Sequence, residues 1–180
     1  MRIWLFAALA MLASAHSAPA FAEVMASSPS AFTIRGEQVI AASPERAWGE
    51  VTQISRWWDS AHTYSGDARR LSLTARAGGC FCERWNGQSV EHARVILAME
   101  SEGVRTLRMY GALGPLQAMG AHGVLTITVA PQGVGAKISF EYRVDGDASL
   151  ELDSLAAPVN SVLMMQLERL SRFAATGVAD

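Results

Sequence analysis

Glu83 is the first residue whose type and surroundings could do chemistry. It alternates with Phe81 and Trp85, so a regular strand would place its carboxylate on the same face as two aromatic side chains. Burial there would raise the pKa of the carboxyl unless an Arg or His paired with it, and this is one way to make a general acid or base. The alternative, which we favour, is a structural ion pair with one of three arginines: Arg84, Arg94 or Arg108.

His92 is the second candidate, and it lies on the strand expected after the one that carries Glu83. It shares a face with Arg94, whereas Val95 begins the apolar face, so regular alternation predicts that the imidazole points to solvent. A β-bulge in this strand would turn the ring inward instead. Glu83 and His92 are therefore weak catalytic candidates from the sequence alone.

A double tryptophan precedes a polar loop at residues 60–67 that carries hydrogen-bonding side chains. Trp57 and Trp58 stand in a predicted short helix that cannot bury both rings, so we expect one to pack in the core and the other to line a rim. His62 and Tyr64 follow in the loop. They either hydrogen-bond a ligand or anchor the loop itself.

Cys80 and Cys82 are the only cysteines. Two residues apart in a regular strand, their side chains share a face and their Cα atoms lie roughly 6.5–7 Å apart. That separation is at the outer limit of disulfide geometry, so we favour two unpaired, half-buried thiols over a strained or intermolecular disulfide. A metal site is least favoured, because no nearby Cys-His cluster supplies further ligands. If both cysteines face inward, Glu83 faces solvent.

Motifs for harder chemistry are absent from the sequence. It has no phosphate-binding P-loop, no GxSxG elbow, no HExxH and no CxxC. His62, His92 and His122 are too dispersed to indicate a metal site, so we expect neither a metal nor a cofactor. The formal net charge is −2 and no basic block is present, which argues against binding to nucleic acid or an anionic membrane.

The N-terminus has the layout of a secretory signal peptide. A weakly positive start precedes an unbroken apolar run at residues 3–13, and Ala20-Phe21-Ala22 is a small-x-small cleavage site. The run is well short of the roughly 20 residues that span a membrane, although an uncleaved N-terminal anchor is the alternative. We predict cleavage after Ala22 and a periplasmic or secreted protein without a transmembrane segment. The expected parts are a signal peptide (1–22), a flexible mature N-terminus (23–30) and one folded domain (31–177).

Hydrophobic periodicity predicts an α+β domain. A strand around residues 32–40, interrupted near Gly36, precedes a helix that Ser43 caps and Pro44 begins. A second short helix carries the double tryptophan. Six short strands with period-two alternation and turns between them then predict an antiparallel meander. These strands lie at residues 71–75, 81–85, 95–99, 107–109, 125–129 and 138–144.

A long amphipathic helix is predicted at the C-terminus. Pro158 fits its start, apolar side chains follow at helical spacing as far as Phe173, and Gly177 fits its end. About 18 residues span roughly 27 Å, enough to cross a sheet. A curved sheet with one polar face must bury the other, and this helix is the only large apolar element available. The space between them predicts an interior cavity.

This order of elements, with several local strings, resembles the START/Bet v 1-like (SRPBCC) superfamily. The strings are SPERAW from Ser43, the Trp57-Trp58 pair, GCFCERW from Gly79, GALGPLQ from Gly111 and APVNSVLMMQLERL from Ala157. The bacterial branch of polyketide cyclase/dehydrase-like and AHSA1-like proteins is the most similar part. The resemblance, from about Phe32 to Phe173, implies the helix-grip fold, a curved sheet of about seven strands on a long C-terminal helix. It does not imply one function, since members bind lipids, sterols, polyketides and hormones, and some are enzymes.

The expected cavity makes a small-molecule carrier or sensor the primary hypothesis, with an apolar or amphipathic ligand held non-covalently. The alternatives are a cyclase/dehydratase-type enzyme that uses Glu83 as acid or base, and a protein-interaction module. The module would use the glycine-rich loop at residues 111–123, which is either a lid over the cavity or a compact loop under the helix. The expected ligand contacts are Trp57, Trp58, His62, Tyr64, Phe81, Glu83, Trp85, Leu113, Leu116, Met119 and Leu163.

Overall fold

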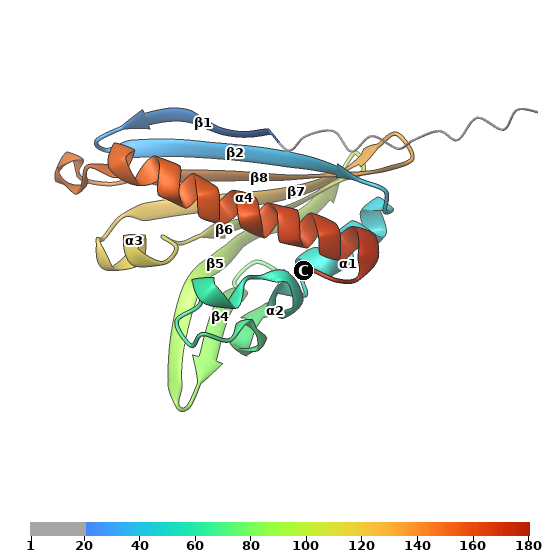
Figure 1. The fold of residues 1–180 in the computed structure, drawn as a ribbon, viewed down its shortest axis with the longest axis horizontal. Coiled ribbons are helices and arrows are strands. Elements are labelled where there is room, and N and C mark those ends of the chain that lie inside the picture. The colour runs from blue at the N-terminus through green and yellow to red at the C-terminus, as the bar shows by residue number, and fades with distance from the viewer. Residues whose placement is uncertain (1–20) are drawn as a thin grey trace, which may run out of the picture.

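A computed structural model describes residues 21–180, with side chains from Glu23 onward, and shows a curved sheet wrapped on a long C-terminal helix (Figure 1). The sheet is antiparallel throughout, and its order is β1-β2-β8-β7-β6-β5-β4-β3. From β3 to β8 each strand pairs with the next in sequence, which confirms the predicted meander. The strands are β1 (Phe21–Ser28), β2 (Ala31–Ile40), β3 (Leu71–Leu73), β4 (Cys80–Trp85), β5 (Gln88–Ser101), β6 (Val104–Tyr110), β7 (His122–Gln132) and β8 (Gly135–Asp145).

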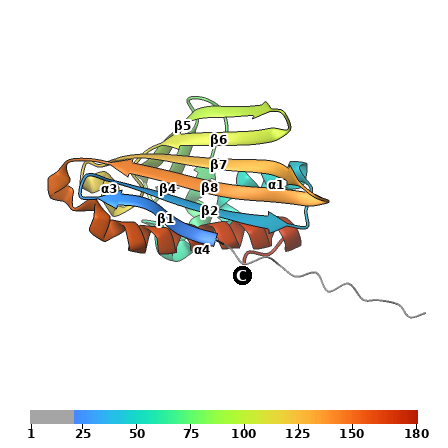
Figure 2. The same ribbon diagram turned by 90° about the horizontal axis from the view of Figure 1, so that it is seen from above.

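The helices lie on the concave side of the sheet (Figures 1 and 2). Ser43 caps α1, because its Oγ accepts the Arg46 backbone N–H at 3.3 Å, and Pro44 is the first helical residue, as the sequence predicts. Short 3₁₀ turns fill the loop that follows α2. The helices and turns are α1 (Pro44–Val51), α2 (Ile54–Trp57), η1 (Ser60–His62), η2 (Ala68–Arg70), α3 (Pro115–Ala118), η3 (Ala148–Leu150) and α4 (Leu152–Thr176).

The N-terminal residues differ from the expected flexible tail at 23–30, because β1 pairs along the outer edge of β2. Glu23 lies opposite Arg35 and Ser27 lies opposite Phe32. Main-chain hydrogen bonds to an open sheet edge need no particular side-chain pattern, so small and polar residues gave no strand signal. Residues 1–20 lie outside the described residues, so the signal peptide stays a prediction. Its expected cleavage site after Ala22 falls within the bounds of β1.

The C-terminal helix α4 has 25 residues and begins at Leu152, so it is longer than predicted and Pro158 lies inside it. At 1.5 Å per residue it spans about 37 Å. It crosses β2 closely at Gly36, where an added Cβ would overlap the Met164 sulfur. This contact explains why a glycine interrupts the apolar pattern of that strand. Among the described helices none is long and apolar enough to cross a membrane.

Cys80 and Cys82 form a disulfide, contrary to the favoured prediction of two free thiols. Their Cα atoms are 5.4 Å apart, within the usual range for disulfides and shorter than a regular strand would give. The pairing of β4 with β5 shifts register between Phe81 and Cys82, so the strand is not regular there. The prediction failed because it assumed an undistorted strand.

Candidate ligand cavity

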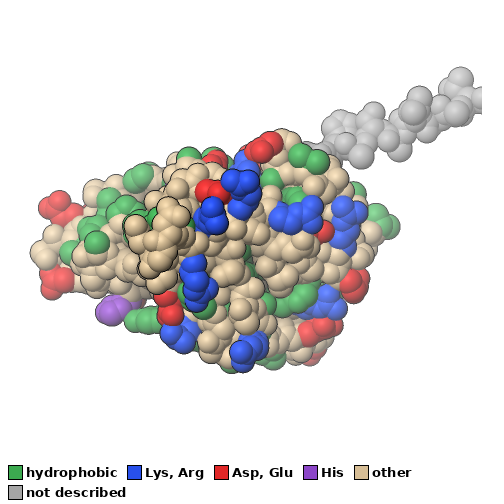
Figure 3. All heavy atoms as spheres, turned by 90° about the horizontal axis from the view of Figure 1, so that it is seen from below, with side chains coloured by type: hydrophobic (Ala, Val, Ile, Leu, Met, Phe, Trp, Pro, Cys, Tyr) green, Lys and Arg blue, Asp and Glu red, His purple; other side chains and the backbone are tan. Residues whose placement is uncertain are grey.

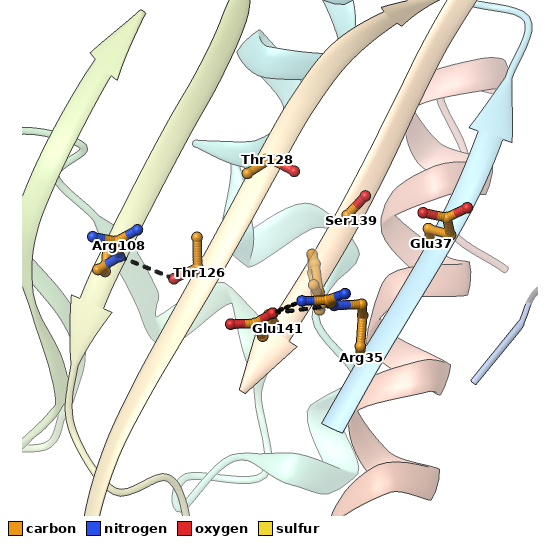
Figure 4. Close-up of a pocket in the computed structure, with 8 residues that line it drawn as sticks. Arg35, Glu37, Arg108, Thr126, Thr128, Ser139 and Glu141 are labelled. Carbon is orange, nitrogen blue, oxygen red and sulfur yellow. Dashed lines mark hydrogen bonds and ion pairs between the residues drawn. The ribbon is translucent and has the colours of Figure 1, made fainter. Parts of the chain in front are cut away.

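The outer, convex face of the sheet carries a polar groove of about 370 Å³ (Figure 4). Arg35 donates to the Glu141 carboxylate across two strands, and Arg143 Nε donates to the same carboxylate at 2.8 Å. Arg108 Nε donates to Thr126 Oγ1 at 3.1 Å. Each of these charged groups therefore already has a polar partner on the sheet. The groove is therefore the polar surface expected on the outer face of a half-buried sheet.

A larger cavity of about 660 Å³ lies on the concave side, against the N-terminal half of α4. Its volume is in the range of roughly 300–1,000 Å³ that is typical of small-molecule sites. Apolar side chains supply most of its wall, with a few hydrogen-bonding groups among them. The cavity is lined by Trp58, His62, Thr63, Tyr64, Phe81, His92, Leu113, Gly114, Pro115, Leu116, Ala118, Met119, Tyr142, Leu155, Pro158, Val159, Val162 and Leu163.

The structure brings most of the predicted ligand contacts to this wall. Those that line it are Trp58, His62, Tyr64, Phe81, Leu113, Leu116, Met119 and Leu163. Trp57 does not, because its ring is buried in the core and its Nε1 donates to the Glu50 carbonyl oxygen at 3.0 Å. Trp85 does not either, since it ends β4 beside the turn to β5. Glu83 lies behind the wall and reaches the cavity only through His92.

Several lining residues were missed by sequence reasoning. Tyr142 points inward from β8, and its two-residue alternation with the buried Phe140 was a signal that could have found it. Leu155, Val159 and Val162 line the cavity from α4. The helical spacing could have found Leu155 as well, but the expected helix start at Pro158 excluded it.

Glu83 is completely buried and accepts three hydrogen bonds. The backbone N–H groups of Tyr64 and Ser65 donate to its two carboxylate oxygens at 3.0 and 2.6 Å. His92 Nε2 lies 3.0 Å from Glu83 Oε2. The predicted ion pair with an arginine is therefore wrong, and the partners are an imidazole and the loop at residues 60–67.

A β-bulge turns His92 inward, which corrects the prediction of an outward-facing ring. Phe81 pairs with Ala93 and Cys82 pairs with Glu91, so His92 is the extra residue on β5. His92 and Ala93 are in consequence both buried. The imidazole packs beside the Phe81 ring with centroids 4.7 Å apart.

The environment of the pair sets its charge. Burial alone would raise the pKa of Glu83, but the hydrogen bonds from Ser65, Tyr64 and His92 outweigh it and hold that pKa below its usual value. Burial lowers the pKa of His92, although its hydrogen bond to Glu83 opposes the shift. Near pH 7 the pair is thus an ionised carboxylate with a neutral imidazole. Such a ring can accept a hydrogen bond or take up a proton at its second nitrogen.

Two tyrosines fasten the glycine-rich loop over the cavity. Tyr142 Oη accepts the Leu113 N–H at 2.8 Å and donates to the Gly111 carbonyl oxygen at 3.3 Å. Tyr64 Oη donates to the Gly114 carbonyl oxygen at 3.1 Å. An added Cβ at Gly123 would lie 2.6 Å from Tyr142 Oη, so this glycine permits the close approach. The loop contains α3 and presents apolar side chains to the cavity.

The face seen from below in Figure 3 carries charges of both signs interspersed with apolar side chains. A field of one sign would steer charged partners toward a surface over long range. The mixed pattern on this face gives no such field.

Comparisons with protein-family models and with curated proteins find no match. Among solved structures, the Aha1 dimer from Colwellia psychrerythraea is similar with a TM-score of 0.53 and 18% identity, over 81% of this chain and 97% of that one. A hypothetical protein, jhp0584 from Helicobacter pylori, has a TM-score of 0.53 and 14% identity, over 78% and 86%. Ara h 8.0201 has a TM-score of 0.50 and 11% identity, over 80% and 97%. This likeness shows the fold alone, and the curved antiparallel sheet on a long C-terminal helix is the helix-grip fold that the sequence predicts.

Proposed function

We propose that this chain is an exported carrier or sensor that binds a small apolar or amphipathic molecule non-covalently. The cavity of about 660 Å³ carries the proposal, because a mostly apolar wall with a few placed polar groups is the common form of a small-molecule site. The similarity to solved structures supports a fold that holds ligands, and it does not identify one. Export rests on the predicted signal peptide in residues 1–22.

Native mass spectrometry and a fluorescent probe test the binding. Protein purified from the periplasm should carry a co-purifying small molecule under gentle ionisation. After delipidation, it should bind the neutral probe N-phenyl-1-naphthylamine. Val159→Trp should abolish probe binding by filling the cavity, whereas Ala157→Trp, on the exposed side of α4, should not. A clean apo mass together with no probe binding would refute the carrier.

Fractionation tests the export. The chain expressed from its own start codon should accumulate outside the cytoplasm. Its intact mass should equal that of a chain that begins at Glu23. A cytoplasmic protein that retains Met1 would contradict the predicted signal peptide.

A second candidate function is acid/base catalysis, and the Glu83–His92 pair favours it. In this proposal His92, rather than Glu83, transfers the proton, because of the two only His92 lines the cavity. A neutral imidazole held by a carboxylate can abstract a proton next to a carbonyl group. Deuterium exchange into the methyl group of para-octylacetophenone measures this step by NMR. If wild type and His92→Gln exchange it at the same rate, the enzymatic function fails for such ketones.

A further inference from the structure

Most polar side chains of the cavity wall already donate their hydrogen bonds to backbone carbonyl groups. These bonds are Trp58 Nε1 to His62 O (2.9 Å), Thr63 Oγ1 to Ser60 O (2.8 Å), Tyr64 Oη to Gly114 O (3.1 Å) and Tyr142 Oη to Gly111 O (3.3 Å). His62 is the exception among the described lining residues, and its Nδ1 is sealed from the cavity without a partner. The wall therefore has few donors to offer a ligand.

His92, in contrast, offers an acceptor. The N–H groups of Tyr64 and Ser65 stabilise Glu83 as a carboxylate and its pKa lies below the usual value, so the facing His92 nitrogen, Nε2, carries the proton and donates it. The proton on Nε2 leaves a lone pair on Nδ1. This atom has no hydrogen-bond partner within residues 21–180, and it is not among the sealed polar atoms. Because the ring lines the cavity, Nδ1 is the polar atom of His92 that a ligand can reach.

The charge next to this acceptor is negative. Glu83 is fully buried directly behind the imidazole, and the described lining contains no Lys or Arg. A carboxylate ligand would enter a low-dielectric space without a counter-charge and beside a buried anion. A neutral hydroxyl group would instead donate a hydrogen bond to His92 Nδ1 without burying an unpaired charge.

From this geometry we propose that the cavity selects a neutral amphipathic molecule whose hydroxyl group donates a hydrogen bond to His92 Nδ1, and that it rejects the corresponding carboxylate. The inference rests on the proposed carrier function and adds the class of ligand. The apolar body of the ligand would lie along the part of the wall formed by Leu113, Leu116, Met119, Val159 and Leu163.

Three probes with one shared tail test the selection: para-octylphenol, para-octylanisole and para-octylbenzoate. Each displaces N-phenyl-1-naphthylamine from delipidated protein at pH 8. A hydrogen bond to Nδ1 should make the phenol bind about fivefold more tightly than the anisole. The uncompensated charge should weaken the benzoate at least about tenfold relative to the phenol.

The variant His92→Phe keeps a ring and removes both nitrogens, so the phenol should lose its advantage over the anisole. His122→Phe, whose parent residue is exposed on β7, should keep it. If His92→Phe does not fold, long-range ¹H–¹⁵N spectra of the wild type replace it. The phenol should shift the His92 Nδ1 resonance and leave Nε2 protonated, and the anisole should not shift Nδ1.

The outcomes separate this inference from the function on which it rests. If no probe binds, including the naphthylamine, the carrier function fails and the inference fails with it. If the naphthylamine binds but the benzoate matches the phenol, the cavity does not select against anions and the inference is overturned. Equal binding of phenol and anisole also overturns it, while the apolar carrier stands.

Discussion

Replacing Glu83 should destabilise the protein, because one buried and two partly buried donors lose their acceptor. These donors are the N–H groups of Tyr64, Ser65 and His92 Nε2. Leaving one buried donor unpaired costs about 1–3 kcal/mol, and breaking a buried charged pair costs about 3–5 kcal/mol. We therefore expect Glu83→Leu to lower the free energy of unfolding by about 3–5 kcal/mol.

Glu83→Gln should cost less, because the amide keeps one acceptor oxygen. Its NH₂ group must still face at least one of the donors, so we expect a loss of about 2 kcal/mol. For a domain of this size that corresponds to a fall in Tm of roughly 4–8 °C. The substitution is thus not a neutral probe of catalysis, and any loss of activity must be measured below the variant's own melting temperature.

Urea unfolding followed by tryptophan fluorescence measures these differences. Glu91→Gln is the matched control, since Glu91 is exposed on β5 and its ion pair with Arg94, at 2.7 Å, should contribute at most about 0.5 kcal/mol. If Glu83→Gln and Glu91→Gln unfold at the same urea concentration with the same slope, the buried hydrogen-bond set does not exist as described.

Three further results are expected. Burial lowers the pKa of His92 below 6.5. Hydrogen bonds lower the pKa of Glu83 below 4.5, although burial opposes them. Both groups therefore bind more protons in the unfolded chain than in the folded protein. The free energy of unfolding should therefore fall as the pH decreases below 6.5, and a rise in urea titrations would contradict the charge assignment. Gly123→Ala should cost about 1–3 kcal/mol in the same assay, because its Cβ would collide with Tyr142 Oη. Alkylation under denaturing conditions should leave Cys80 unmodified unless the protein is first reduced; modification without reduction would refute the disulfide.

The sheet and the long helix could be predicted because their patterns are local. Each strand from β3 to β8 overlaps one of the predicted segments, since one buried face enforces a two-residue period. The errors fell where the deciding interaction is not local. β1 depends on an open edge of β2, and α4 continues through Pro158 because its first turns cover the cavity.

Much of the apolar wall, together with His62 and Tyr64, was accessible from the sequence, whereas the inward position of His92 was not. Phe81 and Leu163 follow from the strand and helix patterns and line the cavity. The inward position of His92 depends on a one-residue bulge between β4 and β5. Alternation within a single strand contains no information about such a shift, because the bulge belongs to the pairing of two strands.

The same carboxylate that orients His92 also fixes the loop at residues 60–67 to the sheet. Two successive N–H groups of this loop donate hydrogen bonds to Glu83, and Tyr64 Oη donates to the Gly114 carbonyl oxygen on the glycine-rich loop. The imidazole and both loops beside the cavity are therefore connected through one buried anion. Because a charge in this position stabilises the fold only while its donors remain, the polar chemistry of the cavity and the closure of its loops cannot vary independently.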